Sequence, residues 1–252
     1  WQFGFLSAGM LGIIGAVLIF IFLKPFPHDA IDGDVFVNRK EIGKKQLSVL
    51  KSGTIWLLAL SSAFMYISRY AVNSWGVYYF EVEKHYSIVE ASGLISISSI
   101  CGIIGTVFSG LLSDKLFRGK RYIPACLASF MNLIALYLFL YIPDGGKLMD
   151  IVAMVLFGIS IGILICYLGG LMAIDLAPKE ATGAAVGVIG IASYMAAGIQ
   201  DILSGFFIES KKQIIGGVEI IDFSFIRMFW ILSAMVSLLL LICIYYKHHR
   251  RV

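Results

Sequence analysis

The chain has 252 residues, of which 59% are hydrophobic and only 14% are charged, and this balance excludes an ordinary water-soluble domain. The net charge of +4 matters only through its placement, and we expect no nucleic-acid partner. The four cysteines lie singly in apolar stretches, and the four histidines lie outside them. We therefore expect no metal site, no cofactor and no enzyme.

Seven apolar stretches follow one another along the chain, each close to the 20 residues that a membrane-spanning helix needs. They cover about residues 3–23, 53–80, 90–112, 121–142, 151–174, 183–208 and 225–246. The first is no signal peptide, because it lacks a basic start and a small-residue cleavage site. The sequence therefore predicts an all-α membrane protein with about seven transmembrane helices.

Residues 24–52 form the only long polar segment, and they separate the first stretch from six that have short connections. Six helices after a basic linker fit one half of a transporter built from two six-helix repeats. We expect residues 1–23 to be the last helix of an N-terminal half, 24–52 a central cytoplasmic linker and 53–252 a C-terminal six-helix half. On this interpretation, five N-terminal helices of the same transporter are missing from the sequence.

The basic residues predict how the chain crosses the membrane. Fourteen of the 20 lysines and arginines fall on one side of the predicted spans and five on the other. Because basic residues favour the cytoplasmic side, we expect a multi-pass protein of the inner (plasma) membrane with its C-terminus in the cytoplasm.

The stretch at 53–80 contains an arginine near its middle, Arg69. Insertion of an arginine at this depth costs roughly 2.5 to 3.5 kcal/mol. Tyr66, Arg69 and Asn73 share one helix face, which must meet a water-filled cavity or a buried partner. One alternative is an ion pair with Asp201, the only acid deep in any predicted span. The other, which we favour, is an anion site, because guanidinium matches phosphate or carboxylate in a two-pronged contact.

A second motif, "GLLSDKLFRGKR", follows the stretch at 90–112. An acid at a helix end with basic residues one turn later can form a charge network that holds one conformation closed. The alternative is a solvated anchoring loop. The residues of this candidate gating motif are Gly110, Asp114, Arg118, Gly119 and Arg121.

A third motif, "DLAPKEATGAAVGVIGIASYMAAG", spans residues 175–198. Gly183, Gly187 and Gly190 leave one helix face nearly bare, which predicts close helix packing. Tyr194 falls near the middle of the same span, and Asp201 adds polarity further along it. For Asp201 we consider both a coupling role and an ion pair.

At these three motifs the sequence resembles the major facilitator superfamily. "YISRYAVNSWGVYYFEVEKH" and the third motif resemble the seventh helix and the tenth-to-eleventh helix region of its organophosphate:phosphate antiporters, nearest to the glycerol-3-phosphate members. The resemblance runs from the sixth helix to the twelfth. It implies that Arg69 and Tyr66 bind phosphate on the seventh helix and Tyr194 on the eleventh. The family's second phosphate arginine, on the first helix, has no counterpart here.

The resemblance implies a secondary transporter that exchanges a small organophosphate for inorganic phosphate by alternating access. Its partners would be the phosphorylated substrate, inorganic phosphate and the lipid bilayer. Some members of the family are instead sugar-phosphate receptors that signal to a membrane histidine kinase, and this alternative stays open. A related facilitator that carries a carboxylate or a drug is a further alternative.

Overall fold

The computed structural model describes residues 2–22, 39–142, 146–215 and 218–249. The chain divides into two units, residues 1–41 and 42–252. The first unit contains α1 (Gln2–Phe22), an apolar helix. Residues 23–38 of the expected linker lie outside the described residues, and the rest of it contains α2 (Arg39–Leu50).

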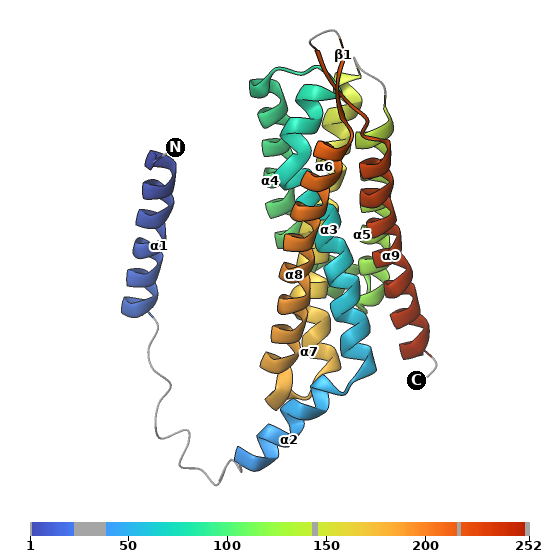
Figure 1. Ribbon diagram of the computed structural model, residues 1–252. Coiled ribbons are helices and arrows are strands. Elements are labelled where there is room, and N and C mark those ends of the chain that lie inside the picture. The colour runs from blue at the N-terminus through green and yellow to red at the C-terminus, as the bar shows by residue number, and fades with distance from the viewer. Residues whose placement is uncertain (1, 23–38, 143–145, 216–217, 250–252) are drawn as a thin grey trace. The chain divides into compact units, whose positions relative to one another are not determined.

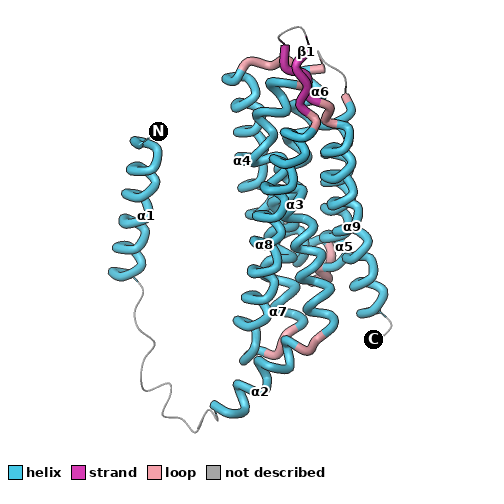
Figure 2. Tube along the Cα trace, in the orientation of Figure 1, coloured by secondary structure: helices cyan, strands magenta, loops and turns pink. Residues whose placement is uncertain are grey.

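Six helices of the second unit are long and apolar enough to cross a membrane. The α-helical parts are α3 (Gly53–Val82), α4 (Ile88–Leu111), α5 (Tyr122–Tyr141), α6 (Lys147–Cys166), α8 (Thr182–Ser210) and α9 (Ser224–His249). A π-helical turn, Leu112–Leu116, extends α4, and another, Tyr167–Leu171, joins α6 to the short α7 (Met172–Leu176). The predicted all-α membrane fold is confirmed (Figures 1 and 2).

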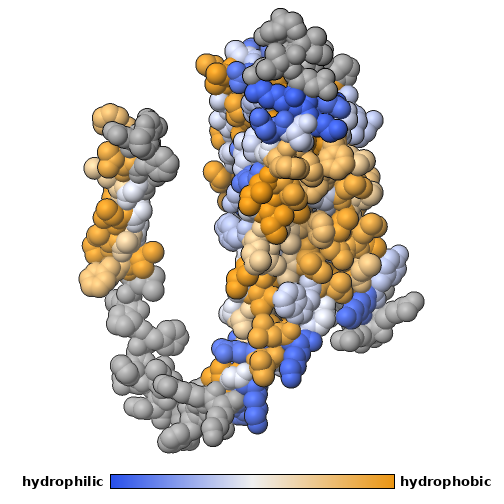
Figure 3. Space-filling view, in the orientation of Figure 1, coloured by the Kyte–Doolittle hydropathy of each residue, from blue (hydrophilic) through white to orange (hydrophobic). Residues whose placement is uncertain are grey.

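One small element was not expected from the sequence. Between α8 and α9 the chain forms an antiparallel hairpin of β1 (Lys212–Ile215) and β2 (Val218–Ile221), at the end of the bundle opposite α2 (Figure 2). The end of the bundle at which α3 begins is called the basic end. The opposite end, which carries the hairpin, is called the hairpin end. On the face shown in Figure 3, apolar side chains cover the middle of the bundle and polar ones gather toward both ends.

The helices differ in how deeply they are buried. About two thirds of the apolar window of α3 lies inside the bundle (67%) and nearly as much of α6 (61%), but only 22% of α4 and of α8. The core is therefore built around α3 and α6, whereas α4 and α8 each keep a broad face uncovered within the described part of the chain.

Glycines allow α4 and α6 to touch backbone to backbone. A Cβ added to Gly158 would lie 2.1 Å from the carbonyl oxygen of Ser98, and one added to Gly162 would lie 2.1 Å from that of Gly102. On α8, by contrast, a Cβ at Gly183, Gly187 or Gly190 would meet no described atom within 4 Å. The close packing predicted for that α8 stripe is therefore absent from the described residues, and the contact lies between α4 and α6 instead.

Charged side chains join the helices at the hairpin end. The Lys84 ammonium, just after α3, donates to the Asp150 carboxylate in the first turn of α6, and both side chains are almost completely buried, with 2% and 0% exposed. The Tyr86 hydroxyl donates to the other Asp150 oxygen at 2.8 Å. A second pair joins Arg227 of α9 to Glu83. These contacts fix the end of α3 to α6 and α9.

Candidate functional site

Arg69 lies close to the middle of the bundle. It is 16 residues after Gly53, where α3 begins, and 13 before Val82, where α3 ends. At a rise of 1.5 Å per residue, these separations are about 24 Å and about 20 Å. Tyr194 has a comparable depth on α8, 12 residues after Thr182 and 16 before Ser210. Residues from two helices therefore meet at mid-depth.

The guanidinium of Arg69 lies over two tyrosine rings. Its central carbon is 5.2 Å from the ring centroid of Tyr66 and 5.5 Å from that of Tyr70. Helix geometry explains the contact with Tyr66, which lies three residues before Arg69 and so on the same face of α3. At these distances the ring faces attract the cation. The two tyrosines therefore hold the guanidinium without neutralising its charge.

Tyr194 reaches this cluster from α8. Its ring centroid is 5.4 Å from that of Tyr66, in an edge-on arrangement with an interplanar angle of 70°. Tyr66 is buried, with 8% of its surface exposed, whereas Tyr194 is 61% exposed. The structure thus brings together Tyr66, Arg69 and Tyr194, three of the four residues predicted to bind substrate.

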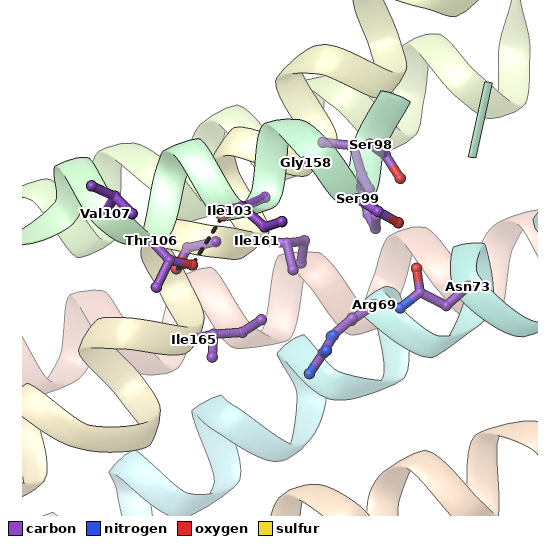
Figure 4. Close-up of a pocket in the computed structure, with 13 residues that line it drawn as sticks. Arg69, Asn73, Ser98, Ser99, Ile103, Thr106, Val107, Gly158, Ile161 and Ile165 are labelled. Carbon is purple, nitrogen blue, oxygen red and sulfur yellow. Dashed lines mark hydrogen bonds between the residues drawn. The ribbon is translucent and has the colours of Figure 1, made fainter. Parts of the chain in front are cut away.

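Arg69 also lines a cavity of about 350 Å³ between α3, α4 and α6. Asn73, the fourth predicted residue, lines it together with Arg69, and both side chains come from α3 (Figure 4). The α4 side supplies Ser98, Ser99 and Thr106. The cavity therefore has one cationic group, several hydroxyl and amide groups, and an apolar remainder from α6.

The polar residues of α4 were not recognised in the sequence as site residues. Ser99 lies in an apolar stretch of the sequence, yet it is exposed and lines the cavity. The Thr106 hydroxyl lies 2.9 Å from the carbonyl oxygen of Gly102 and 3.2 Å from that of Gly162. The available signal was the spacing of Ser99 and Thr106, seven residues apart on one helix face.

The ion pair considered for Arg69 does not form within the described part of the chain. Arg69 has no carboxylate within ion-pair distance there, and neither it nor Asp201 belongs to any described ion pair. An arginine at mid-depth that faces a cavity without a counter-charge can take up an anion.

Asp201 lies nearer the hairpin end, nine residues before the end of α8. Its Oδ1 atom is buried and has no hydrogen-bond partner among the described residues, and the same is true of Nε1 of Trp75 on α3. The two helices touch here, because a Cβ on Gly205, one turn after Asp201, would lie 3.4 Å from the Trp75 ring. At this contact α8 thus carries an acceptor, Asp201 Oδ1, and α3 carries a donor, Trp75 Nε1, and neither has a described hydrogen-bond partner.

The loop after α4 has a tightly turned backbone. Arg118 and Gly119 have left-handed φ angles of 52° and 80°. The Gly119 amide donates to the Ser113 carbonyl oxygen at 2.9 Å and closes the turn. A side chain at Gly119 would be strained in this conformation, which explains why the position is a glycine.

The charge network of this loop has a different acid from the one expected. Asp114 is exposed and accepts a hydrogen bond from the Ser113 hydroxyl at 2.9 Å. Arg121 instead donates to the Asp175 carboxylate at 2.8 Å and to the Leu171 carbonyl oxygen at 2.7 Å. In this conformation the ion pair therefore joins the start of α5 to the end of α7. Gly110 lies in the last turn of α4, and nothing described lies within 4 Å of its Cβ position.

Comparison with known families gives this arrangement its context. Residues 1–200 match the family model described as the Major Facilitator Superfamily. The chain belongs to this superfamily.

Three curated relatives illustrate the range within this superfamily. The chain is 29% identical to a glycerol-3-phosphate transporter of Bacillus subtilis (strain 168), over 83% of the chain and 50% of that protein. It is 30% identical to the membrane sensor protein UhpC of Salmonella typhimurium, over 79% of the chain and 48% of that protein. It is 31% identical to a probable hexose phosphate transport protein of Chlamydia trachomatis, over 68% of the chain and 39% of that protein. This superfamily member therefore spans half or less of the length of each of these three relatives.

Proposed function

We propose that this chain is the C-terminal part of a secondary transporter that exchanges a small organophosphate, of the glycerol-3-phosphate kind, for inorganic phosphate. The observation that carries the proposal is Arg69, a mid-depth guanidinium without a described counter-charge that faces a cavity of about 350 Å³. The names of the relatives support the substrate class, since two of the three are those of phosphorylated-substrate transporters.

Arg69 would hold the phosphate group by two parallel N–H···O contacts, with Tyr66 and Tyr194 adding hydroxyl donors. Charge-assisted contacts of this kind are roughly twice as strong as neutral ones. The tyrosine rings keep the guanidinium in place and leave its donors free, so little order has to be gained when the anion binds. Asn73 and the hydroxyls of α4 would then contact the remainder of the substrate.

Transport would proceed by alternating access, with this half moving against a second half around the bound anion. The helices that line the cavity favour rigid movement, because α3, α4 and α6 contain no proline. Pro124 lies in the first turn of α5, and Pro178 lies between α7 and α8, where neither interrupts a helix. The Arg121–Asp175 pair would act as one of the contacts that differ between the two access states.

The substitution Arg69→Lys tests the phosphate site. It keeps the charge and removes the planar fork, so we expect the affinity for inorganic phosphate to fall about tenfold or more, since each hydrogen bond to a charged group contributes about 1.5 to 3 kcal/mol. Binding of labelled phosphate and counterflow into vesicles would be measured for the intact protein.

Arg227→Lys is the matched control, because Arg227 pairs with Glu83 at the hairpin end, away from the cavity. Its phosphate affinity should stay close to that of the wild type. Unchanged phosphate binding in Arg69→Lys would show that the anion binds elsewhere.

A sensor is the second candidate, because one relative at 30% identity is named a membrane sensor protein. A sensor would use the same anion site without net movement of substrate. Phosphate binding that depends on Arg69, together with no counterflow in vesicles that contain the intact protein, would favour the sensor over the transporter.

A further inference from the structure

Two buried hydroxyl groups join α3 to α8 beside the candidate site. The Oγ atoms of Ser62 and Ser193 lie 2.8 Å apart, and the two residues are almost completely buried, with 0% and 2% exposed. The Ser193 hydroxyl also donates to the carbonyl oxygen of Ile189, one turn earlier on α8, at 2.7 Å. Because a serine hydroxyl has a single hydrogen to donate, Ser193 accepts the hydrogen bond from Ser62.

This hydrogen bond lies about one helical turn from the tyrosine pair of the site. Ser62 is four residues before Tyr66 on α3, which is about 6 Å along the helix axis. Ser193 directly precedes Tyr194 on α8. A shift of either helix that breaks the bond between the serines therefore also changes the spacing of the two tyrosine rings, whose centroids lie 5.4 Å apart.

The contact of α3 with α9 is of a different kind. The Ser61 hydroxyl donates to the carbonyl oxygen of Ser237 at 3.0 Å, and the Ser237 hydroxyl donates to the carbonyl oxygen of Ser61 at 2.8 Å. Both bonds have a backbone acceptor, whereas the bond between Ser62 and Ser193 joins two side chains. Loss of one hydroxyl therefore leaves α3 bonded to α9 by the other, but it removes the bond between Ser62 and Ser193 altogether.

We infer that Ser62 and Ser193 are positioning residues of the anion site, an inference that rests on the function proposed above. Both are buried, and neither lines the cavity of Arg69. Their hydrogen bond fixes the position of α8 against α3, so that the hydroxyl groups of Tyr66 and Tyr194 reach the same phosphate group as Arg69. Without the bond the two helices occupy a wider range of positions, and the affinity for the anion falls by the fraction of time that the productive one is lost.

Binding of labelled inorganic phosphate to the intact protein tests this inference. Ser62→Ala removes the bond without leaving a donor unpaired, because Ser193 keeps its bond to Ile189. The affinity for phosphate should fall about three- to tenfold, the net effect of one hydrogen bond. Ser193→Ala removes the same bond from the α8 side and should give a loss of similar size.

Ser61→Ala is the matched control, since it removes a buried hydroxyl from the neighbouring position of α3. Its phosphate affinity should stay within about twofold of the wild type, less than the effect of one neutral hydrogen bond. Equal losses of affinity in Ser61→Ala and Ser62→Ala would mean that the bundle has loosened in general, and would overturn the positioning role.

A double-mutant cycle with Tyr194→Phe separates positioning from a purely structural role. If the serine pair acts through the Tyr194 hydroxyl, Ser62→Ala should cause little further loss of affinity once that hydroxyl is gone. Fully additive losses would refute the inference. Weakened phosphate binding in Arg69→Lys but in neither serine variant would refute the positioning role alone, whereas unchanged binding in Arg69→Lys would count against the anion site itself.

Discussion

At the scale of single residues, Arg69 is placed so that its cost in the membrane is small. Its side chain lines a cavity, and its guanidinium lies over two tyrosine rings. Each ring contact contributes about 0.5 to 2 kcal/mol, depending on how well water is excluded. Two contacts therefore offset a good part of the roughly 2.5 to 3.5 kcal/mol that insertion costs. The two tyrosines stabilise the arginine in the empty state, so that Arg69 needs no acidic partner when no anion is bound.

Asp201 is expected to act on turnover rather than on binding. Because it forms no ion pair with Arg69, Asp201→Asn should leave phosphate affinity within about twofold of the wild type, less than the effect of one neutral hydrogen bond. It removes the only acid deep in a span, so the pH dependence of exchange should change. Exchange rates across a pH series and equilibrium binding would be measured side by side.

Glu209→Gln provides the comparison for this experiment, since Glu209 is an exposed acid near the end of the same helix. Its pH profile should match that of the wild type. If the profile of Asp201→Asn is also unchanged, Asp201 has no part in the transport cycle. If Asp201→Asn loses phosphate binding instead, its role is in the site itself.

The sequence predicted part of the site because helical spacing alone puts Tyr66, Arg69 and Asn73 on one face. It could not place Ser99 in the cavity, because a serine in an apolar span serves equally well as a packing residue or as a cavity residue. Nor could it identify Asp175 as the partner of Arg121, 54 residues away. That pair depends on how α5 packs against α6 and α7.

At the scale of helices, the glycines show what a pattern can and cannot predict. Gly158 and Gly162 allow α4 and α6 to touch, whereas the similar stripe on α8 lies open among the described residues. Spacing identifies a bare helix face, but it does not say which helix, if any, covers that face. Spacing likewise could not show that α3 and α6 lie at the centre of the bundle, because burial depends on which helices pack around them.

Gly158→Ala should therefore destabilise the bundle. The added methyl group would lie 2.1 Å from the carbonyl oxygen of Ser98, and relief requires α4 and α6 to move apart. Overpacking of this kind costs about 1 to 3 kcal/mol, more than the gain of about 1 kcal/mol in helix propensity. Thermal unfolding in detergent would show a clear drop in the midpoint.

Gly187→Ala tests whether that drop comes from the contact. It adds the same methyl group to a helix where no described atom lies within 4 Å. We expect no loss of stability and a small gain from helix propensity. An equal loss in both variants would show that the open face of α8 is covered in the intact protein as tightly as the contact between α4 and α6.

At the scale of the whole molecule, the positions of the basic residues predict the orientation of the bundle. Fourteen of 20 lysines and arginines fall on the side of the C-terminus, and this side should be cytoplasmic. Alkaline phosphatase fused after Ser210, at the end of α8, should be active. The same enzyme fused after His249, at the end of α9, should be inactive. Fluorescent-protein fusions at the two positions should give the reverse pattern, and the opposite result for both reporters would invert the proposed orientation.

The overall fold was easier to predict than its details. Six of the apolar stretches correspond to helices long enough to span a membrane, because apolar length alone determines this feature. The hairpin of β1 and β2 and the helix α2 were not predicted. The strands are short and α2 is polar, so the hydropathy of the sequence does not reveal either element. The expected division into a single helix, a linker and a six-helix half remains a proposal.

The buried pair of Lys84 and Asp150 has a consequence for biogenesis. The two residues are 66 positions apart, so the ribosome delivers Lys84 well before Asp150. Until α6 arrives, the ammonium has to stay hydrated at the membrane surface, because a buried charge without its partner costs about 3 to 5 kcal/mol. The ion pair of Lys84 and Asp150 therefore cannot form until α6 has been synthesised. A nascent chain that stalls before α6 therefore leaves the Lys84 ammonium without its carboxylate partner.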